Sequence, residues 1–159
     1  MSLFENPQYE YTDTFFVFFN RENLPAAKLL ETSIGGLGSR YQPQNLSLKE
    51  DRFESLTVLS PIDYSAVDIV LDLNVEVESQ IEEIDSEFRA MTLSGDDREK
   101  LSLLKKCDAR FDLFHFEQLV SGNDDPDAFI DPGGLLIVLE KLRDLCSGIG
   151  VDPQSQMLL

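Results

Sequence analysis

The most constraining feature of the sequence is an uninterrupted apolar run, Phe-Phe-Val-Phe-Phe at residues 15–19, inside a β-forming segment at residues 12–20. Successive side chains of a strand point to opposite faces, so this run places bulky apolar groups on both faces of a sheet. Such a strand is expected in the interior of a sheet whose two faces are covered. The segment therefore predicts a central strand in a layered domain.

A short helix is expected after this strand. Asn-Leu-Pro at residues 23–25 puts a proline in the first helical turn, and the helix is expected to run through residues 26–33. The glycine-rich stretch at 35–38 ends this helix, because glycine readily adopts the positive φ of such a turn. Its N–H groups offer an anion site as an alternative, but they follow a helix, whereas phosphate loops precede one. The polar residues 39–51 predict a connecting loop or an irregular edge strand.

A β-hairpin is predicted next. Residues 53–60 and 65–73 are rich in β-forming side chains, and turn-forming residues separate them at 61–64. One face of the second strand is apolar, whereas the other face carries Asp68 and Asp72. One side of this hairpin is thus expected in the core and the other side partly in water.

At residues 76–91 the spacing of the apolar residues changes to that of a helix. These residues form one stripe, and acidic side chains cover the remaining surface. A second short helix follows, with Asp96 or Asp97 as its expected N-cap. Residues 109–119 return to the alternation of a strand. Residues 121–131 are expected to form an acidic loop.

A wide apolar stripe at residues 131–149 predicts a last helix that packs on a flat surface. The order strand, helix, strand, strand, helix, strand, with this additional C-terminal helix, is that of a ferredoxin-like split βαβ sandwich with an antiparallel sheet. We predict one α+β domain at 12–150, a loose lead-in at 1–11 and a tail or edge strand at 151–159. Two helices leave one face of such a sheet open, so either the last helix or a second copy, in a homodimer through the sheet face, is expected to cover it.

The chain is strongly acidic. Thirty Asp and Glu against thirteen Lys and Arg give a formal charge of −17, which opposes binding to nucleic acid or to an anionic membrane surface. Residues 61–99 carry twelve acids and two arginines, a net charge of −10. Such a surface either keeps a protein soluble or binds a basic protein partner. The candidate contact residues lie on the acidic helix and in the acidic loop: Glu78, Glu82, Glu83, Asp85, Glu87, Asp124, Asp125 and Asp127.

Two cysteines, Cys107 and Cys146, are too few for a disulfide scaffold. They predict buried, reduced thiols and a cytoplasmic setting. No apolar stretch approaches the roughly 20 residues that a membrane-spanning helix needs.

Residues for catalysis are scarce. His115 is the only histidine, which excludes a His–His metal pair within one chain. It is interpreted as a structural side chain, with a Cys–His nucleophile pair as the alternative. Asp68 and Asp72 lie four residues apart on one strand, about 13 Å at ~3.3 Å per residue, too far to share a metal ion directly. Asp112 and Asp13 are further strand carboxylates to consider for a two-metal site.

The acidic loop at 121–131 offers the hard oxygen ligands that calcium prefers, but it lacks the glycine and glutamate spacing of an EF-hand. A solvated turn before the last helix is the simpler interpretation. The sequence has no zinc spacing, no dinucleotide-binding fingerprint and no Gly-x-Ser-x-Gly turn, so we expect no cofactor.

The favoured hypothesis is a non-enzymatic protein–protein interaction domain: an adaptor, an inhibitor or an immunity-like protein that neutralises a basic partner. One alternative is a small-molecule binding domain that uses an apolar sheet face or a dimer groove. The other is a metal-dependent enzyme that uses Asp68, Asp112 or the carboxylates of residues 121–131.

Overall fold

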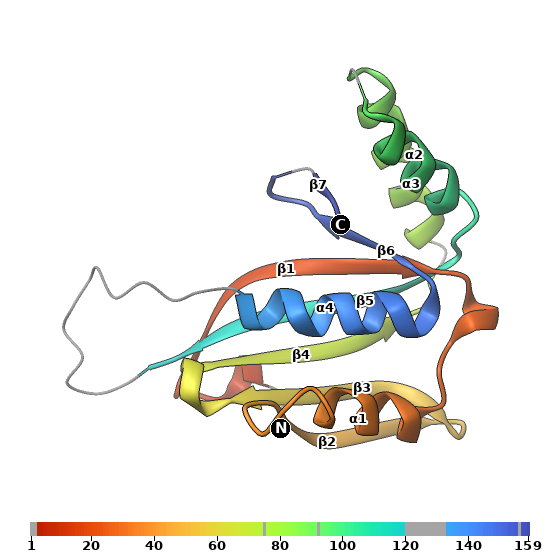
Figure 1. The fold of residues 1–159 in the computed structure, drawn as a ribbon. Coiled ribbons are helices and arrows are strands. Elements are labelled where there is room, and N and C mark those ends of the chain that lie inside the picture. Colours follow the sequence, from red (N-terminus) through yellow and green to blue (C-terminus); the bar gives the residue numbers. More distant parts are fainter. Residues whose placement is uncertain (1–2, 75, 92, 120–132, 156) are drawn as a thin grey trace.

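The computed structural model describes residues 3–74, 76–91, 93–119, 133–155 and 157–159. These residues form an α+β domain with an antiparallel seven-stranded sheet of order β2-β3-β4-β5-β1-β6-β7 (Figure 1). The strands are β1 (Tyr9–Phe19), β2 (Gln42–Lys49), β3 (Arg52–Ser60), β4 (Ser65–Asp72), β5 (Ala109–Gln118), β6 (Ile149–Asp152) and β7 (Met157–Leu158). The α-helices are α1 (Ala27–Gly35), α2 (Glu76–Arg89), α3 (Gly95–Leu104) and α4 (Gly133–Cys146), and 3₁₀ turns occupy Leu3–Glu5, Arg21–Asn23 and Pro61–Asp63.

The Phe-rich strand β1 lies inside the sheet, between β5 and β6, as its apolar character on both faces predicts. Phe15, Val17 and Phe19 belong to the large core under α1 and α4. Phe16 and Phe18 point to the opposite face and contact a second core under α2 and α3. The expected central strand is confirmed.

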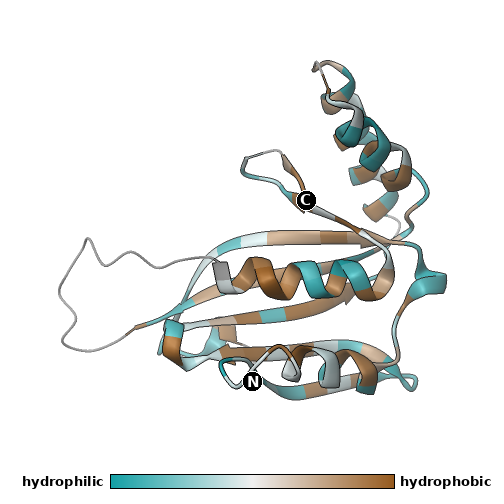
Figure 2. Ribbon diagram, viewed as in Figure 1, coloured by the Kyte–Doolittle hydropathy of each residue, from teal (hydrophilic) through white to brown (hydrophobic). Residues whose placement is uncertain are grey.

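Helices α1 and α4 contact each other and cover one face of the sheet (Figure 1). Leu30 and Ile34 of α1 and Leu139 and Leu142 of α4 are buried in this core. Figure 2 shows the corresponding apolar segments along α4. The last helix therefore shares the face of α1, whereas we expected it on the opposite face, which instead carries the α2–α3 hairpin.

The strand order differs from the predicted ferredoxin-like order. In that sandwich the first strand pairs with the second strand of the hairpin, whereas here β5 lies between β4 and β1. The physical reason is the connection from β4 to β5, in which α2 leads away from the sheet and α3 leads back (Figure 1). As a result β5 starts where β4 ends, and Asp72 pairs with Arg110 in the ladder. Two antiparallel strands whose ends are already adjacent pair with each other directly.

The helices α2 and α3 form a helical hairpin that protrudes from the sheet beside β6 (Figure 1). A second core joins this hairpin to the sheet, and its buried members are Phe18, Val77, Ile81, Ile84, Phe88, Leu101, Leu104, Ile149, Val151 and Leu158. The N-cap of α3 is Ser94, whose hydroxyl accepts from the N–H of Asp97 at 3.2 Å, so the prediction of Asp96 or Asp97 as the cap was wrong. Both aspartates already lie in the first helical turn, where their charge interacts favourably with the helix dipole.

The segments at both ends of the chain also enter the sheet. Residues 9–11 are part of β1, and Leu3 is buried against Ala66 and Phe116. The last residues form the short strands β6 and β7, of which β7 is an edge strand. The stretch expected as a loop or an irregular edge strand at 39–51 contains the other edge strand, β2. In the described ranges no helix is both long and apolar enough to cross a bilayer.

Helix α4 ends at Cys146, so Ile149, expected on its apolar stripe, instead starts β6. The chain turns at Gly148, which packs directly on β1. A Cβ atom at this position would lie 2.5 Å from the carbonyl oxygen of Phe18 and 3.0 Å from Val17 Cγ1. Only glycine allows this approach of backbone to backbone.

We predict that Gly148→Ala lowers the free energy of unfolding by about 1–3 kcal/mol, because the new methyl group forces β6 away from β1. Gly95→Ala is the matched control, since no atom lies within 4 Å of a Cβ at that site. Urea denaturation of both variants measures the difference. Equal stability of the two variants would contradict the close contact.

Candidate functional site

The candidate contact residues on the acidic helix all lie on α2, in the protruding α2–α3 hairpin. Glu78, Glu82, Glu83 and Glu87 are exposed, whereas the side chain of Asp85 is only 16% exposed. The remaining candidates, Asp124, Asp125 and Asp127, lie outside the described residues. The structure thus brings the α2 candidates together on one protruding element.

Asp85 differs from the four glutamates because it is engaged within the hairpin. Its Oδ2 atom lies 3.0 Å from Nε of Arg89, and its Oδ1 atom lies 3.4 Å from Nζ of Lys105 on the segment after α3. The Oδ1 atom is buried and its contact with Lys105 is electrostatic, without hydrogen-bond geometry. Asp85 therefore joins the two arms of the hairpin and is a poor candidate for contact with a partner.

The four exposed glutamates form two like-charge pairs at i and i+4, Glu78 with Glu82 and Glu83 with Glu87. Within the described part of the chain, none of them forms an ion pair with a basic side chain. Like charges at this spacing destabilise a helix by about 0.2–0.5 kcal/mol per pair. The arrangement on α2 is locally unfavourable in the isolated chain.

A hollow lies on each side of α2. On the side of α3, Glu78 and Glu82 border a hollow of about 340 Å³ that is also lined by Ile81, Cys107 and the ion pair of Asp85 with Lys105. On the side of β6, Glu83 and Glu87 border a hollow of about 190 Å³, with Ile84, Phe88, Val151 and Pro153 in its lining. Each hollow therefore combines an acidic rim with an apolar lining.

The base of the hairpin is held by Arg110 of β5, a residue that sequence patterns did not single out. Its guanidinium donates to Asp72 at 2.8 Å and to Asp112 at 2.5 Å, and it also donates to Gln80 of α2. Its Cζ atom lies 4.6 Å from the centre of the Phe16 ring. Arg110 thus connects α2 with β4, β5 and β1. Only the strand order reveals this role, because the partners are far apart in the sequence.

We predict that Arg110→Gln lowers the free energy of unfolding by about 2–3 kcal/mol, because it leaves two largely buried carboxylates without their cation. Burial already raises the pKa of Asp112, and Arg110 opposes this rise. Arg143→Gln is the control, since its ion pair with Asp144 is exposed and is worth less than about 1 kcal/mol. Urea denaturation at neutral pH compares the two variants, and an equally small loss in both would refute the anchoring role.

His115 is buried in β5, and its Nδ1 atom lies 2.6 Å from the Thr12 hydroxyl. Thr12 in turn donates to Asp13 at 2.7 Å. Because an ionised carboxylate can only accept, the hydroxyl proton of Thr12 is used for Asp13. The Thr12 oxygen therefore accepts a hydrogen bond from Nδ1–H of His115. This series of hydrogen bonds gives Nδ1 of His115 a partner and supports a structural role for the histidine.

Burial lowers the pKa of His115, and the charges of Asp13 and Glu117 oppose this shift. The unfolded chain therefore binds a proton near pH 6.5, whereas the folded protein binds it only at lower pH. The free energy of unfolding therefore keeps its full value, as far as His115 is concerned, above pH 6.5 and decreases as the pH falls below it.

We predict that the wild-type protein loses up to about 1.4 kcal/mol of stability per pH unit below pH 6.5, relative to His115→Asn. The asparagine amide keeps a donor for Thr12 and does not titrate in this range. Urea titrations between about pH 7.5 and 5.5 give both slopes. Coincident slopes would show that His115 does not titrate on unfolding.

Neither cysteine has the properties of a nucleophile. Both thiols are free, Cys146 is buried, and Cys107 is partly buried. Burial raises the pKa of Cys107 to about 11 and that of Cys146 to about 12, so both are thiols at neutral pH. His115 contacts neither of them in its described hydrogen bonds. The structure does not assemble the Cys–His pair.

The carboxylates considered for metal binding have other partners. Asp68 accepts from the Thr57 hydroxyl at 2.6 Å and from the N–H of Leu3 at 3.4 Å, and Asp112 is held by Arg110. Among the described residues, no three His, Cys, Asp or Glu side chains are grouped so that they could hold a metal ion. The described strands thus provide no support for a metal-dependent enzyme.

The glycine-rich stretch ends α1 as expected, with Gly36 as its C-cap and Gly38 at a φ of 142°.

Comparisons of the chain with protein-family models, with curated proteins and with solved structures gave no match. The candidate site is consequently defined by the chemistry of the α2–α3 hairpin alone.

Proposed function

We propose that this protein is a non-enzymatic interaction domain that binds a basic protein partner through α2, as an adaptor, an inhibitor or an immunity-like protein does. The observation that carries the proposal is the pair of acidic hollows on either side of α2. Two glutamates without an ionic partner in the described chain border each hollow.

Lysine and arginine side chains match these hollows in shape and charge. Each has an aliphatic stem and a cationic head, so the stem packs on apolar surface while the head remains near polar groups. Ile81 on one side of α2, and Ile84 with Phe88 on the other, supply the apolar surface. The glutamates supply the counter-charge at the rim.

The energetics of α2 also favour this proposal over a surface that is only solubilising. A solubilising surface needs charge but gains nothing from like charges at i and i+4, which destabilise the helix. When a cationic partner binds, its positive charges attract the glutamates of both pairs and offset the repulsion between them. It also accelerates association by electrostatic steering, because the net charge of the chain is −17.

The structure supports the alternative functions less well. The sheet face considered for a small molecule, opposite α1 and α4, is partly covered by the α2–α3 hairpin and by Leu3. The two free thiols fit a reducing compartment, and we propose the cytoplasm as the place of action. A homodimer through the sheet face remains a prediction, tested by comparing solution mass with chain mass.

The test uses a helical peptide of about 15 residues with lysines at i and i+4 on one face, and a scrambled peptide of the same composition. We expect the wild-type protein to bind the ordered peptide more tightly, with an affinity that falls as salt rises from about 0.05 to 0.3 M. The double variant Glu83→Gln, Glu87→Gln should lose most of this preference. Its thermal stability should stay equal or rise slightly, because one repulsive pair is gone.

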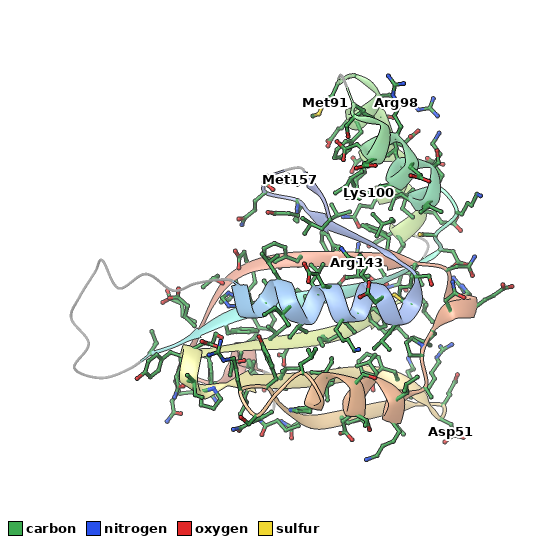
Figure 3. All side chains as sticks on the ribbon, viewed as in Figure 1. Asp51, Met91, Arg98, Lys100, Arg143 and Met157 are labelled. Atoms are coloured by element: carbon green, nitrogen blue, oxygen red, sulfur yellow. The ribbon has the colours of Figure 1, made fainter. Side chains whose placement is uncertain are left out.

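The matched control is Glu50→Gln, Asp51→Asn, which changes the charge equally in the exposed turn between β2 and β3. Figure 3 shows Asp51 far from the hairpin. We expect the control to bind as the wild type does, as measured by fluorescence anisotropy. Equal binding of the two peptides, or equal losses in the two double variants, would leave only the solubilising function.

A further inference from the structure

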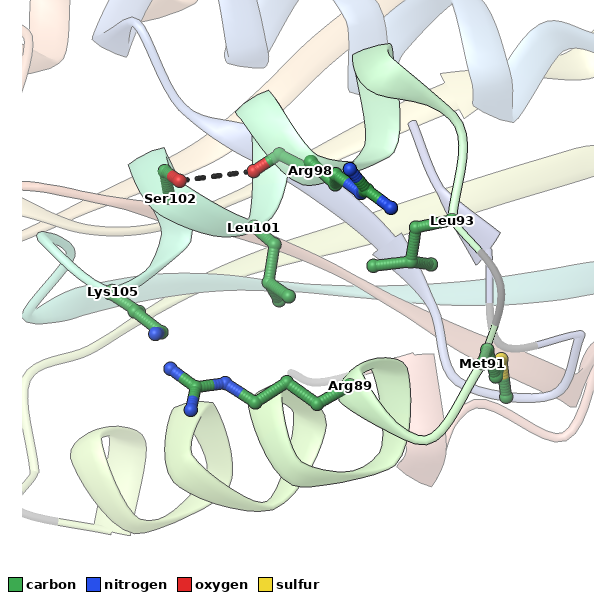
Figure 4. Close-up of a pocket in the computed structure, with 7 residues that line it drawn as sticks. All are labelled: Arg89, Met91, Leu93, Arg98, Leu101, Ser102 and Lys105. Carbon is green, nitrogen blue, oxygen red and sulfur yellow. Dashed lines mark hydrogen bonds between the residues drawn. The ribbon is translucent and has the colours of Figure 1, made fainter.

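The outer part of the α2–α3 hairpin contains a third hollow, of about 300 Å³ (Figure 4). The described residues that line it come from the end of α2, the turn and α3: Arg89, Met91, Leu93, Arg98, Leu101, Ser102 and Lys105. This lining includes three basic side chains and no acidic one. In a chain with thirteen basic and thirty acidic residues, such a local excess of positive charge is unusual.

The three cations are held differently. Arg89 and Lys105 point toward each other on one side of Leu101 (Figure 4), because both contact Asp85. Each of them keeps further N–H donors, since an arginine has five and a lysine three. Arg98 extends beside Leu93 on the other side, and its guanidinium has no ionic partner in the described part of the chain.

The lining of the hollow is apolar where the cations do not reach. Leu101 is 6% exposed, and Leu93 packs against the same core. Met91 is 44% exposed, and Figure 3 shows it with Arg98 at the outer end of the hairpin. Ser102 donates its hydroxyl to the backbone carbonyl of Arg98 within α3, so it offers no free proton to a ligand.

We propose that this hollow binds a small amphiphilic anion, a carboxylate or a phosphate monoester on a short apolar chain. Arg98 holds the anionic head with its free donors, and the nearby charges of Arg89 and Lys105 add to the attraction. The apolar chain lies on Leu93 and Leu101. The volume is at the lower end of the range for small-molecule sites, which fits a chain of about eight carbons.

This site is independent of the proposed contact with a basic protein. It shares only Lys105 with the hollow beside Glu78 and Glu82, lies otherwise on different residues of the hairpin, and has the opposite charge. The variant Glu83→Gln, Glu87→Gln should bind the anion as the wild type does, so failure of one proposal leaves the other intact.

The experiment titrates the folded protein with octanoate, octyl phosphate, octanol and inorganic phosphate, and follows the methyl resonances of Met91, Leu93 and Leu101 by NMR. We expect the two amphiphilic anions to shift these resonances with dissociation constants on the order of 1 mM. Octanol and inorganic phosphate should bind at least about tenfold more weakly, because each lacks one half of the recognised chemistry. The stronger of the two amphiphilic anions identifies the preferred head group.

Arg98→Gln should weaken binding by about tenfold, because a charge-assisted hydrogen bond to the head is lost. Lys100→Gln is the matched control on the same helix, outside the lining, and should change the affinity less than about twofold. Both side chains lie at the surface of α3, so both variants should fold. The proposal is overturned if octanol binds as tightly as octanoate, if inorganic phosphate binds as tightly as octyl phosphate, if Arg98→Gln binds normally, or if no methyl resonance shifts.

Discussion

The pairing of β1 with β5 is the constraint on which the rest of the structure depends. The two strands form the longest ladder of the sheet, from Tyr9 with Gln118 to Phe19 with Ala109. The rings of Phe19 and Phe111 stack across it, with their centres 4.6 Å apart. Because β1 is apolar on both faces, this ladder requires one cover for each face. Helices α1 and α4 provide one cover, and the α2–α3 hairpin provides part of the other.

The second cover also carries the proposed functions. The apolar side of α2 packs toward Phe18, and its opposite side carries the glutamates. Arg110 fixes the base of the hairpin through Gln80, Asp72 and Asp112. The acidic hollows and the basic hollow therefore have defined positions relative to the sheet, although they lie on a protruding element. Preorganisation of this kind lowers the entropic cost of binding.

The order of residues along single segments predicted those parts of the fold that depend only on neighbouring residues. The interior position of β1, the turn at Pro61–Asp63 and the acidic exterior of α2 follow from side-chain alternation, turn chemistry and helical period. The strand order did not follow, because side-chain alternation shows which residues of a strand face the core but not which strand it pairs with. Ile149 was misplaced on a helix because its apolar character fits both states, and only the contact of Gly148 with β1 decides between them. Of the candidate site, the glutamates were predicted, whereas Arg110 and the hollows depend on contacts between distant segments.

The adjacency of Asp72 and Arg110 in the ladder makes the α2–α3 hairpin an insertion between two strands that already meet. Its removal would leave ends close enough for a short β-turn, since the sheet itself does not use the inserted residues for its pairing. The exposed residues of the hairpin are thus free to vary in charge while the pairing of β4, β5 and β1 stays the same, provided that its apolar side still covers Phe18. A change in the exposed residues of the hairpin therefore alters the surface that the domain presents to a partner without altering how its strands pair.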